Sequence, residues 1–207
     1  FMAIGGYVSA LLTKNCGVPV FVGVLGGMLV ASIVGYLISY PTLRLRDDYF
    51  IIVTLGIGEA IKLIIQNTES ITGGARGLSD VPSGSNVFVV WGVVILTVIG
   101  LWSFIQSKHG RNCIAVREDE IAARSVGVNI FKYKMEAMII SCALCGCAGA
   151  FLAHYMHFLH PNMFTMAKSD ELIIVVILGG RGSLTGTILA GLLLLPLPEL
   201  LRFGSAE

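Results

Sequence analysis

The sequence predicts an all-α fold, a polytopic bundle of transmembrane helices, from three observations. Apolar residues make up 55% of the 207 positions and charged residues only 13%, against roughly 25% charged residues in soluble domains. Mean hydropathy is +0.83. A strongly charged segment, residues 108–136, lies between two stretches without Asp, Glu, Lys or Arg, residues 81–107 and 137–167. Such a segment is typical of a loop between membrane helices, and the net charge of +1 gives no reason to expect a nucleic-acid partner.

Apolar runs define the expected spans, which are residues 1–13 (partial), 17–40, 49–66, 87–106, 135–157 and 171–203. A span needs roughly 20 residues, so the first run is short and we expect the chain to be an N-terminally truncated fragment. Glycines at 179–186 interrupt the last run, which predicts either a broken span or a re-entrant segment. Because no soluble domain or linker is evident, residues 1–207 are expected to form a single transmembrane domain.

The distribution of basic residues predicts the orientation of these spans. The loop of residues 107–134 carries six of the fourteen Lys and Arg residues, and loops rich in basic residues face the cytoplasm. Residues 41–48 fall on the same side. Residues 67–86 and 158–170, with one basic residue each, fall on the external side.

Motifs for chemistry are absent from the sequence. It has neither the Gly-x-x-x-x-Gly-Lys-Ser/Thr phosphate loop nor the Gly-x-Ser-x-Gly nucleophile turn, so we expect no catalytic residue, no cofactor and no enzyme. Cys142, Cys145 and Cys147 are interpreted as small packing residues rather than as metal ligands. The three histidines of residues 154–160 are interpreted as part of an interfacial belt rather than as a metal site.

Glu59 and Lys62 lie deep in an apolar run, three residues apart and therefore on one helix face. Charges at bilayer depth are costly, about 2.5–3.5 kcal/mol each on insertion scales. The pair either compensates itself and fixes one helix against its neighbours, or borders a translocation route. Gly56 and Gly58, just before the pair, leave room for close backbone contact.

The predicted external loop contains a glycine-punctuated turn, residues 72–78. One interpretation is a simple surface turn. The other is an external lip that touches substrate or a delivery protein, formed by Thr72, Gly73, Gly74 and Gly77.

The middle of the charged segment predicts a short amphipathic helix. Acidic residues open it, where a helix N-terminus favours negative charge, small residues follow and a glycine ends it. It is either a solvated loop helix or a rigid protrusion that docks on a separate ATPase. The residues assigned to this ATPase-coupling element are Glu118, Asp119, Glu120, Ala122, Ala123 and Gly127.

Four stretches in order resemble the permease subunits of branched-chain amino-acid ABC importers of the LivM type. They are LRLRDDYFIIVTLGIGE at 43–59, TGGARGL at 72–78, REDEIAA at 117–123 and VVILGGRGSLTG at 175–186. The resemblance runs over essentially the whole chain and implies helices before Phe1. It also implies a second, homologous permease subunit, two cytoplasmic ATPase subunits and a periplasmic or lipid-anchored substrate-binding protein, in a bacterial inner membrane.

The family's coupling loop maps onto residues 118–127, with two departures from the general pattern. Permeases of ABC importers carry Glu-Ala-Ala followed four residues later by Gly, whereas Ile121 stands here in place of the Glu and Glu120 lies one position early. Lys62 stands where the family suggests Arg, so the charged pair lacks a bidentate guanidinium.

Three alternatives to a branched-chain amino-acid permease stay open. An ATP-independent channel could use the glycine-rich segment as a re-entrant filter with Arg181. A secondary transporter should show two matching discontinuous helices, and the sequence shows one interruption. Urea and amide importers have similar permeases.

Overall fold

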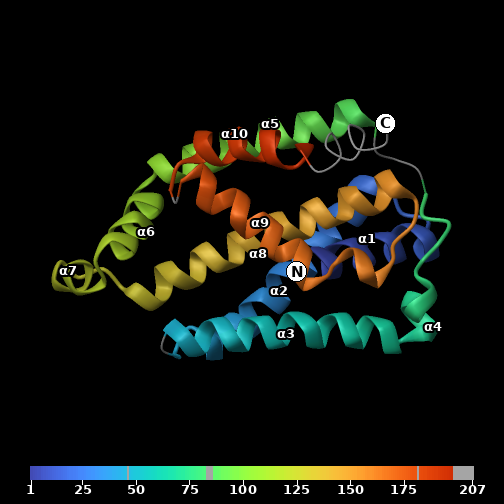
Figure 1. Ribbon diagram of the computed structural model, residues 1–207, viewed down its shortest axis with the longest axis horizontal. Coiled ribbons are helices and arrows are strands. Elements are labelled where there is room, and N and C mark those ends of the chain that lie inside the picture. The colour runs from blue at the N-terminus through green and yellow to red at the C-terminus, as the bar shows by residue number, and fades with distance from the viewer. Residues whose placement is uncertain (46, 83–85, 181, 198–207) are drawn as a thin grey trace. The chain divides into compact units, whose positions relative to one another are not determined.

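The computed structural model describes residues 1–45, 47–82, 86–180 and 182–197, and within these ranges the chain is helical without a β-strand. The predicted all-α fold is therefore confirmed. In chain order (Figure 1) the elements are α1 (Met2–Cys16), α2 (Val20–Thr42), α3 (Asp47–Asn67), α4 (Glu69–Thr72), η1 (Gly74–Arg76), α5 (Val87–Gln106), α6 (Lys108–Glu118), α7 (Glu120–Ser125), α8 (Ile130–Met156), η2 (Pro161–Met163), α9 (Met166–Gly179) and α10 (Leu184–Leu194).

Among the described residues, four helices are long and apolar enough to cross a membrane: α2, α3, α5 and α8. The observed bounds of α5 coincide with the expected ones. Helix α8 begins at Ile130 rather than at 135, because the side chain of Asn129 accepts a hydrogen bond from the backbone N–H of Lys132 at 3.1 Å and caps the helix there.

The contacts divide the chain into two compact units, Phe1–Phe164 and Thr165–Glu207, so the organisation as one membrane domain stays a prediction. The centre of the first unit is α8, which packs along both α1 and α2. Small residues line this packing: a side chain at Gly149 would overlap the carbonyl of Met2, and one at Gly5 would overlap the backbone of Gly146. In membranes, such residues let helix backbones approach closely.

Helices α3 and α5 differ from this three-helix centre. None of the described residues of α5 is buried, and α3 buries only Ile65, near its C-terminal end, among the residues whose burial is described. Both helices therefore present large apolar side chains, such as Ile52 and Leu96, to their surroundings.

The second unit consists of α9 and α10, which run side by side in opposite directions. Gly179 lies against Thr187, and Val175 lies near Gly191, as expected for an antiparallel pair. With 14 and 11 residues the helices are about 21 Å and about 17 Å long. Each is shorter than the hydrocarbon core of about 30 Å. The predicted interruption is thus a turn between two short helices, and Arg181 lies outside the described residues.

Candidate functional site

The charged segment, expected as a loop with one short helix, contains two helices joined at Asp119. Helix α6 begins at Ser107, whose Oγ accepts from the N–H of Gly110 at 3.2 Å. Asp119 ends α6 and caps α7, since its Oδ1 accepts from the N–H groups of Ile121 and Ala122 at 2.8 and 3.0 Å. Glu118 thus belongs to the end of α6, not to the start of the coupling helix. We refer to α6 and α7 together as the cytoplasmic hairpin, after the side of the membrane on which the basic residues predict it to lie.

Gly127 ends the α7 segment for a conformational reason. Its φ of +82° lies in the left-handed region that glycine favours. This turn brings the N–H of Val128 to the carbonyl of Ala123 at 3.0 Å. The position assigned to Gly127 from sequence is therefore a helix stop, as expected.

The two alanines assigned to docking have different environments. Ala122 is exposed, whereas Ala123 is 3% exposed and faces its own chain. Glu120 forms an ion pair with Lys134 and thereby connects α7 to α8. Of the two alanines assigned to the coupling element, Ala122 is therefore open to a docking partner and Ala123 is not.

Exposed apolar residues mark the outer surface of α7 instead. Ile121 is 84% exposed and Val126 is 76% exposed. Ala122 is exposed as well, and we call these three exposed apolar residues the α7 patch. The sequence analysis noted Ile121 only as a departure from the family pattern and missed Val126. The sequence signal that could have identified them is that both are large apolar residues in a segment, residues 117–127, that otherwise holds charged, polar and small residues.

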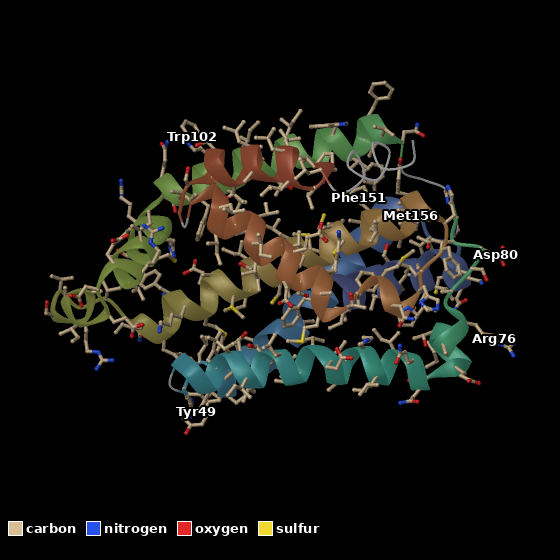
Figure 2. All side chains as sticks on the ribbon, in the orientation of Figure 1. Tyr49, Arg76, Asp80, Trp102, Phe151 and Met156 are labelled. Atoms are coloured by element: carbon tan, nitrogen blue, oxygen red, sulfur yellow. The ribbon has the colours of Figure 1, made fainter. Side chains whose placement is uncertain are left out.

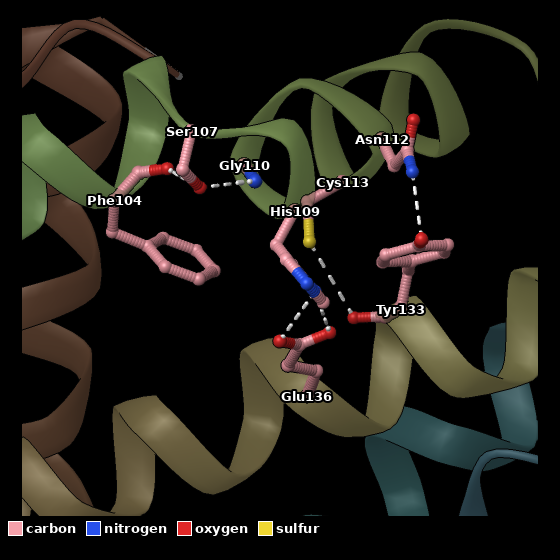
Figure 3. A network of polar contacts seen from close by, with 8 residues as sticks. All are labelled: Phe104, Ser107, His109, Gly110, Asn112, Cys113, Tyr133 and Glu136. Carbon is pink, nitrogen blue, oxygen red and sulfur yellow. Dashed lines mark hydrogen bonds and ion pairs between the residues drawn. The ribbon is translucent and has the colours of Figure 1, made fainter.

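The cytoplasmic hairpin is attached to the first turns of α8 by polar contacts (Figure 3). His109 Nδ1 lies 2.9 Å from Glu136 Oε1. The Nδ2 of Asn112 donates to the hydroxyl of Tyr133 at 2.6 Å. The thiol of Cys113 lies 3.7 Å from the carbonyl of Tyr133, and its pKa is raised by burial and then by the carboxylate of Glu136.

These contacts could not be predicted from the sequence, because the residues that form them are 20 to 27 positions apart.

Glu59 and Lys62 of α3 form the predicted pair, with 2.7 Å between Lys62 Nζ and Glu59 Oε1. Lys62 is the more buried partner, with 18% of its side chain exposed against 45% for Glu59. Successive helical residues are separated by about 100°, so Gly58 lies about 40° from Lys62, whereas Gly56 lies about 60° from Glu59 and about 120° from Lys62. A side chain at either glycine would meet nothing within 4 Å, so neither makes the close contact that the sequence suggested within the described part of the chain.

The predicted lip folds into α4 and η1. The hydroxyl of buried Thr72 donates to the carbonyl of Ile65 at 2.6 Å and accepts from the N–H of Gly74 at 3.3 Å. Gly73, Gly74 and Gly77 have positive φ angles of 75°, 58° and 80°. The structure thus gives Thr72 and the three glycines roles in forming the turn itself.

The segment after the lip is fixed to the segment that follows α8. Leu78 and Leu159 exchange backbone hydrogen bonds of 2.8 and 2.9 Å, and a side chain at Gly77 would overlap the carbonyl of Leu159. Figure 2 shows Arg76 and Asp80 pointing away from the helices, and both are exposed. These charged side chains, rather than the glycines, are the surface that the lip presents.

The three histidines do not share an environment. His154 is fully buried, with Nε2 3.0 Å from Ser9 Oγ and Nδ1 3.0 Å from the carbonyl oxygen of Pro82. His157 is exposed, and His160 accepts from the N–H of Asn162. The interfacial interpretation is therefore wrong for His154, which joins α8 to α1 and to the segment before α5.

Comparison with known proteins places these features in a class. The family described as "Branched-chain amino acid transport system / permease component" matches residues 1–204, and the chain belongs to this family. Family membership and the four span-length helices of the described residues make it a multi-pass membrane protein. No solved structure matches the chain.

The individual relatives that the chain matches are longer proteins, and the chain aligns with only part of each. The chain is 34% identical to the high-affinity branched-chain amino acid transport system permease protein LivM of Escherichia coli, over 98% of this chain and 56% of that protein. It is 28% identical to a probable LivM of Methanocaldococcus jannaschii, over 78% of this chain and 51% of that protein. It is 27% identical to LivH of Salmonella typhimurium, over 92% and 70%. The chain thus spans about half the length of the LivM proteins.

Proposed function

We propose that this chain is the permease subunit of an ABC importer that moves branched-chain amino acids across a bacterial inner membrane. It works with a homologous second permease subunit, two cytoplasmic ATPase subunits and an external substrate-binding protein. The observation that carries the proposal is the α7 patch on its capped, glycine-ended helix. An apolar patch outside the membrane segments costs free energy in water, and a docking cleft on an ATPase would cover it.

If an ATPase docks on the α7 patch, docking is tested by substitutions at the exposed residues of the patch rather than at Ala123. A new bulky residue at Ala123 would disrupt the hairpin itself, because that alanine is buried. Ile121→Asp places a charge on the exposed patch, where it is harmless until the patch is covered. A buried, unpaired carboxylate is costly, so we expect ATPase association to fall at least about tenfold, or about 1.4 kcal/mol.

The test is co-purification of the ATPase subunits with the permease, alongside uptake of leucine into proteoliposomes. Ile71→Asp is the matched control, since Ile71 is also exposed but belongs to α4. It should leave ATPase association unchanged. Normal association in Ile121→Asp would contradict docking through this helix, and uptake without ATP would favour the channel alternative.

Orientation follows from the same proposal. Cysteines introduced at Asn112 and Ser125 should react with an impermeant reagent only from the cytoplasmic side, and one at Ser79 only from the external side. The charge asymmetry of the loops supports this topology. Reaction at Ser79 from the inside would contradict it.

The charged pair of α3 is proposed to border the translocation route. Charged residues in membrane helices normally face protein or a water-filled path, and Glu59 remains 45% exposed. Its uncovered side therefore faces the second permease subunit or the substrate path rather than lipid. If Glu59→Gln with Lys62→Met assembles normally but transports slowly, the pair borders the route; normal transport would leave it a structural pair.

The external lip is proposed to receive the binding protein through Arg76 and Asp80. Both side chains are exposed and opposite in charge, which suits complementary pairs that steer association. Charge reversal at both residues should raise the binding-protein concentration needed for half-maximal uptake. The substrate class is tested by loading the binding protein with leucine, urea or an amide, and uptake of urea alone would identify the amide branch of the family.

A further inference from the structure

The turn from α7 into α8 contains a pocket of about 370 Å³. Its size falls within the range of small-ligand sites, about 300–1,000 Å³. The residues that line it are Arg124, Gly127, Val128, Asn129, Ile130 and Phe131. The charge in this lining comes from Arg124, so the pocket favours an anionic occupant.

A second arginine adjoins this pocket through Phe131. The guanidinium carbon of Arg44, just after α2, lies 5.9 Å from the ring centre of Phe131 and 4.5 Å from that of Tyr40. Arg44 also donates to the hydroxyl of Tyr40 at 2.7 Å, and the rings of Tyr40 and Phe131 meet edge to face with 5.8 Å between their centres. Stacking on aromatic rings fixes the plane of a guanidinium. The N–H donors that these contacts leave open are thus oriented before a ligand arrives, which lowers the cost of binding.

The two arginines also differ from the other basic residues of the α7 and α8 region in their partners. Arg117 pairs with Glu118, and Lys134 pairs with Glu120. No ion pair among the side chains that the structure describes includes Arg44 or Arg124. Guanidinium groups are well suited to phosphate oxygens, which they bind through two parallel N–H groups.

The depth of the pocket indicates which anion suits it. Phe131 lies four positions before residue 135, where the expected apolar span of α8 begins, and four residues of helix rise about 6 Å. The headgroup layer on each side of the hydrocarbon core is about 5–8 Å thick. Tyr36 and Tyr40, in the last two turns of α2, are 46% and 44% exposed, and tyrosines gather at membrane–water interfaces. The pocket therefore lies at the level of lipid phosphates.

We propose that Arg44 and Arg124 bind the headgroup phosphate of an anionic phospholipid in the cytoplasmic leaflet, with its acyl chains along Tyr40 and Phe131. Basic pockets between membrane helices on the cytoplasmic side are a known form of lipid site. A zwitterionic lipid would bring its ammonium group close to the same arginines, so an anionic headgroup is favoured. The site goes beyond the proposed transport function, although the choice of leaflet rests on the orientation proposed with it.

The first test compares two lipids that differ in headgroup charge. The complete importer in detergent is titrated with phosphatidylglycerol and, separately, with phosphatidylcholine of the same acyl chains, and bound lipids are counted by native mass spectrometry. The unmodified protein should prefer phosphatidylglycerol. Arg44→Gln and Arg124→Gln should each weaken its binding about fivefold, the contribution of one basic side chain near an anionic surface.

Arg111→Gln is the matched control, because Arg111 is exposed on α6 and does not line the pocket. It should leave the binding of phosphatidylglycerol unchanged. Equal weakening in all three variants would overturn the site, since diffuse surface charge would then account for the attraction.

The second test keeps the charge and removes the guanidinium. In Arg44→Lys and Arg124→Lys the side chain stays positive but cannot bind two phosphate oxygens through parallel N–H groups. Binding of phosphatidylglycerol should therefore fall at least about twofold in each variant. Unchanged binding in both would contradict a site built on the two guanidinium groups.

Two further outcomes would identify a different occupant and overturn the proposal. Displacement of phosphatidylglycerol by inorganic phosphate alone would mean that the pocket takes a free anion. Loss of ATPase co-purification in Arg124→Gln, with phosphatidylglycerol retained, would mean that the pocket faces the ATPase. Labelling of a cysteine at Ser125 from the external side would contradict the proposed orientation and the choice of leaflet. Lipid binding in detergent does not depend on orientation, so the two failures are distinguishable.

Discussion

Helices α8 and α3 are both long and apolar, yet they have different relations to the rest of the chain. Helix α8 buries Cys142, Gly146 and His154 against its neighbours. Helix α3 leaves Gly56 and Gly58 open and carries the charged pair. Apolar composition alone therefore does not distinguish a helix packed within this chain from one whose surface faces other molecules.

The position of small residues distinguishes the two helices. On α8, Gly146 and Gly149 are one turn apart and meet backbone atoms of α1 or α2, so the helices interlock. On α3, Gly56 and Gly58 are two residues apart and lie on nearly opposite faces. A stripe of glycines on one face indicates packing, whereas glycines on two faces do not form a contact surface.

A methyl group added to each helix should show the largest difference. Gly149→Ala places a carbon onto the backbone of Met2, which can move only if α1 shifts, and such overpacking costs about 1–3 kcal/mol or more. Gly56→Ala meets nothing within 4 Å and should stabilise the helix by about 0.5–1 kcal/mol. Thermal unfolding in detergent, followed by size-exclusion chromatography, measures both. Equal melting temperatures would contradict the division between packed and open helices.

The charged pair should show a smaller effect on α3. Lys62→Met leaves Glu59 without its partner, and breaking a fully buried pair costs about 3–5 kcal/mol. Because the Glu59 side chain is 45% exposed, we expect about 1–2 kcal/mol, seen as reduced assembly with the second permease subunit. Glu59→Gln with Lys62→Met should recover most of the assembly. An equal loss in the single and double variants would mean that the pair contributes nothing as a pair.

Much of this fold follows from hydropathy alone. The expected span of residues 87–106 coincides with α5, and the pair at Glu59 and Lys62 follows from helical spacing. Both features depend only on residues close in sequence. The glycine interruption at 179–186 was also evident, although its folded-back geometry depends on contacts between α9 and α10 that spacing does not predict.

What could not be predicted depends on contacts distant in sequence. The charged residues of 108–118 suggested a loop, but α6 forms there. Ser107 caps this helix, and Asn112 donates a hydrogen bond from it to the hydroxyl of Tyr133. Likewise, Ala123 is buried, although the charged residues around it in the sequence suggest an exposed helix. His154 resembles an interfacial histidine in sequence, and only its distant partners Ser9 and Pro82 show otherwise.

Removing the imidazole of His154 should have a further, smaller effect on α8. Two buried hydrogen-bonding groups lose their partner in His154→Leu, for a cost of about 1 kcal/mol net. His157→Ala is the control, since His157 is exposed. Limited proteolysis of the segment after the lip should be faster in His154→Leu alone. Equal proteolysis of both variants would mean that the C-terminal end of α8 is as loosely held as α3.

The smallest expected effect tests whether the N-terminal end of α8 is packed as firmly as the rest of the helix. Burial, and then the carboxylate of Glu136, raises the pKa of the Cys113 thiol. The thiolate is the reactive form, so alkylation of Cys113 should be slow near neutral pH and should rise only at higher pH. Glu136→Gln removes the negative charge, lowers the pKa and shifts this profile to lower pH. The change in rate should be about two- to threefold, since burial, the larger cause, persists.

His109→Gln keeps the carboxylate and can still donate to it, so its profile should match the unmodified protein, measured by mass spectrometry of the Cys113 peptide. If His109→Gln accelerates alkylation as much as Glu136→Gln does, the cause is loosening of α6 rather than charge, and the N-terminal end of α8 is held as weakly as α3.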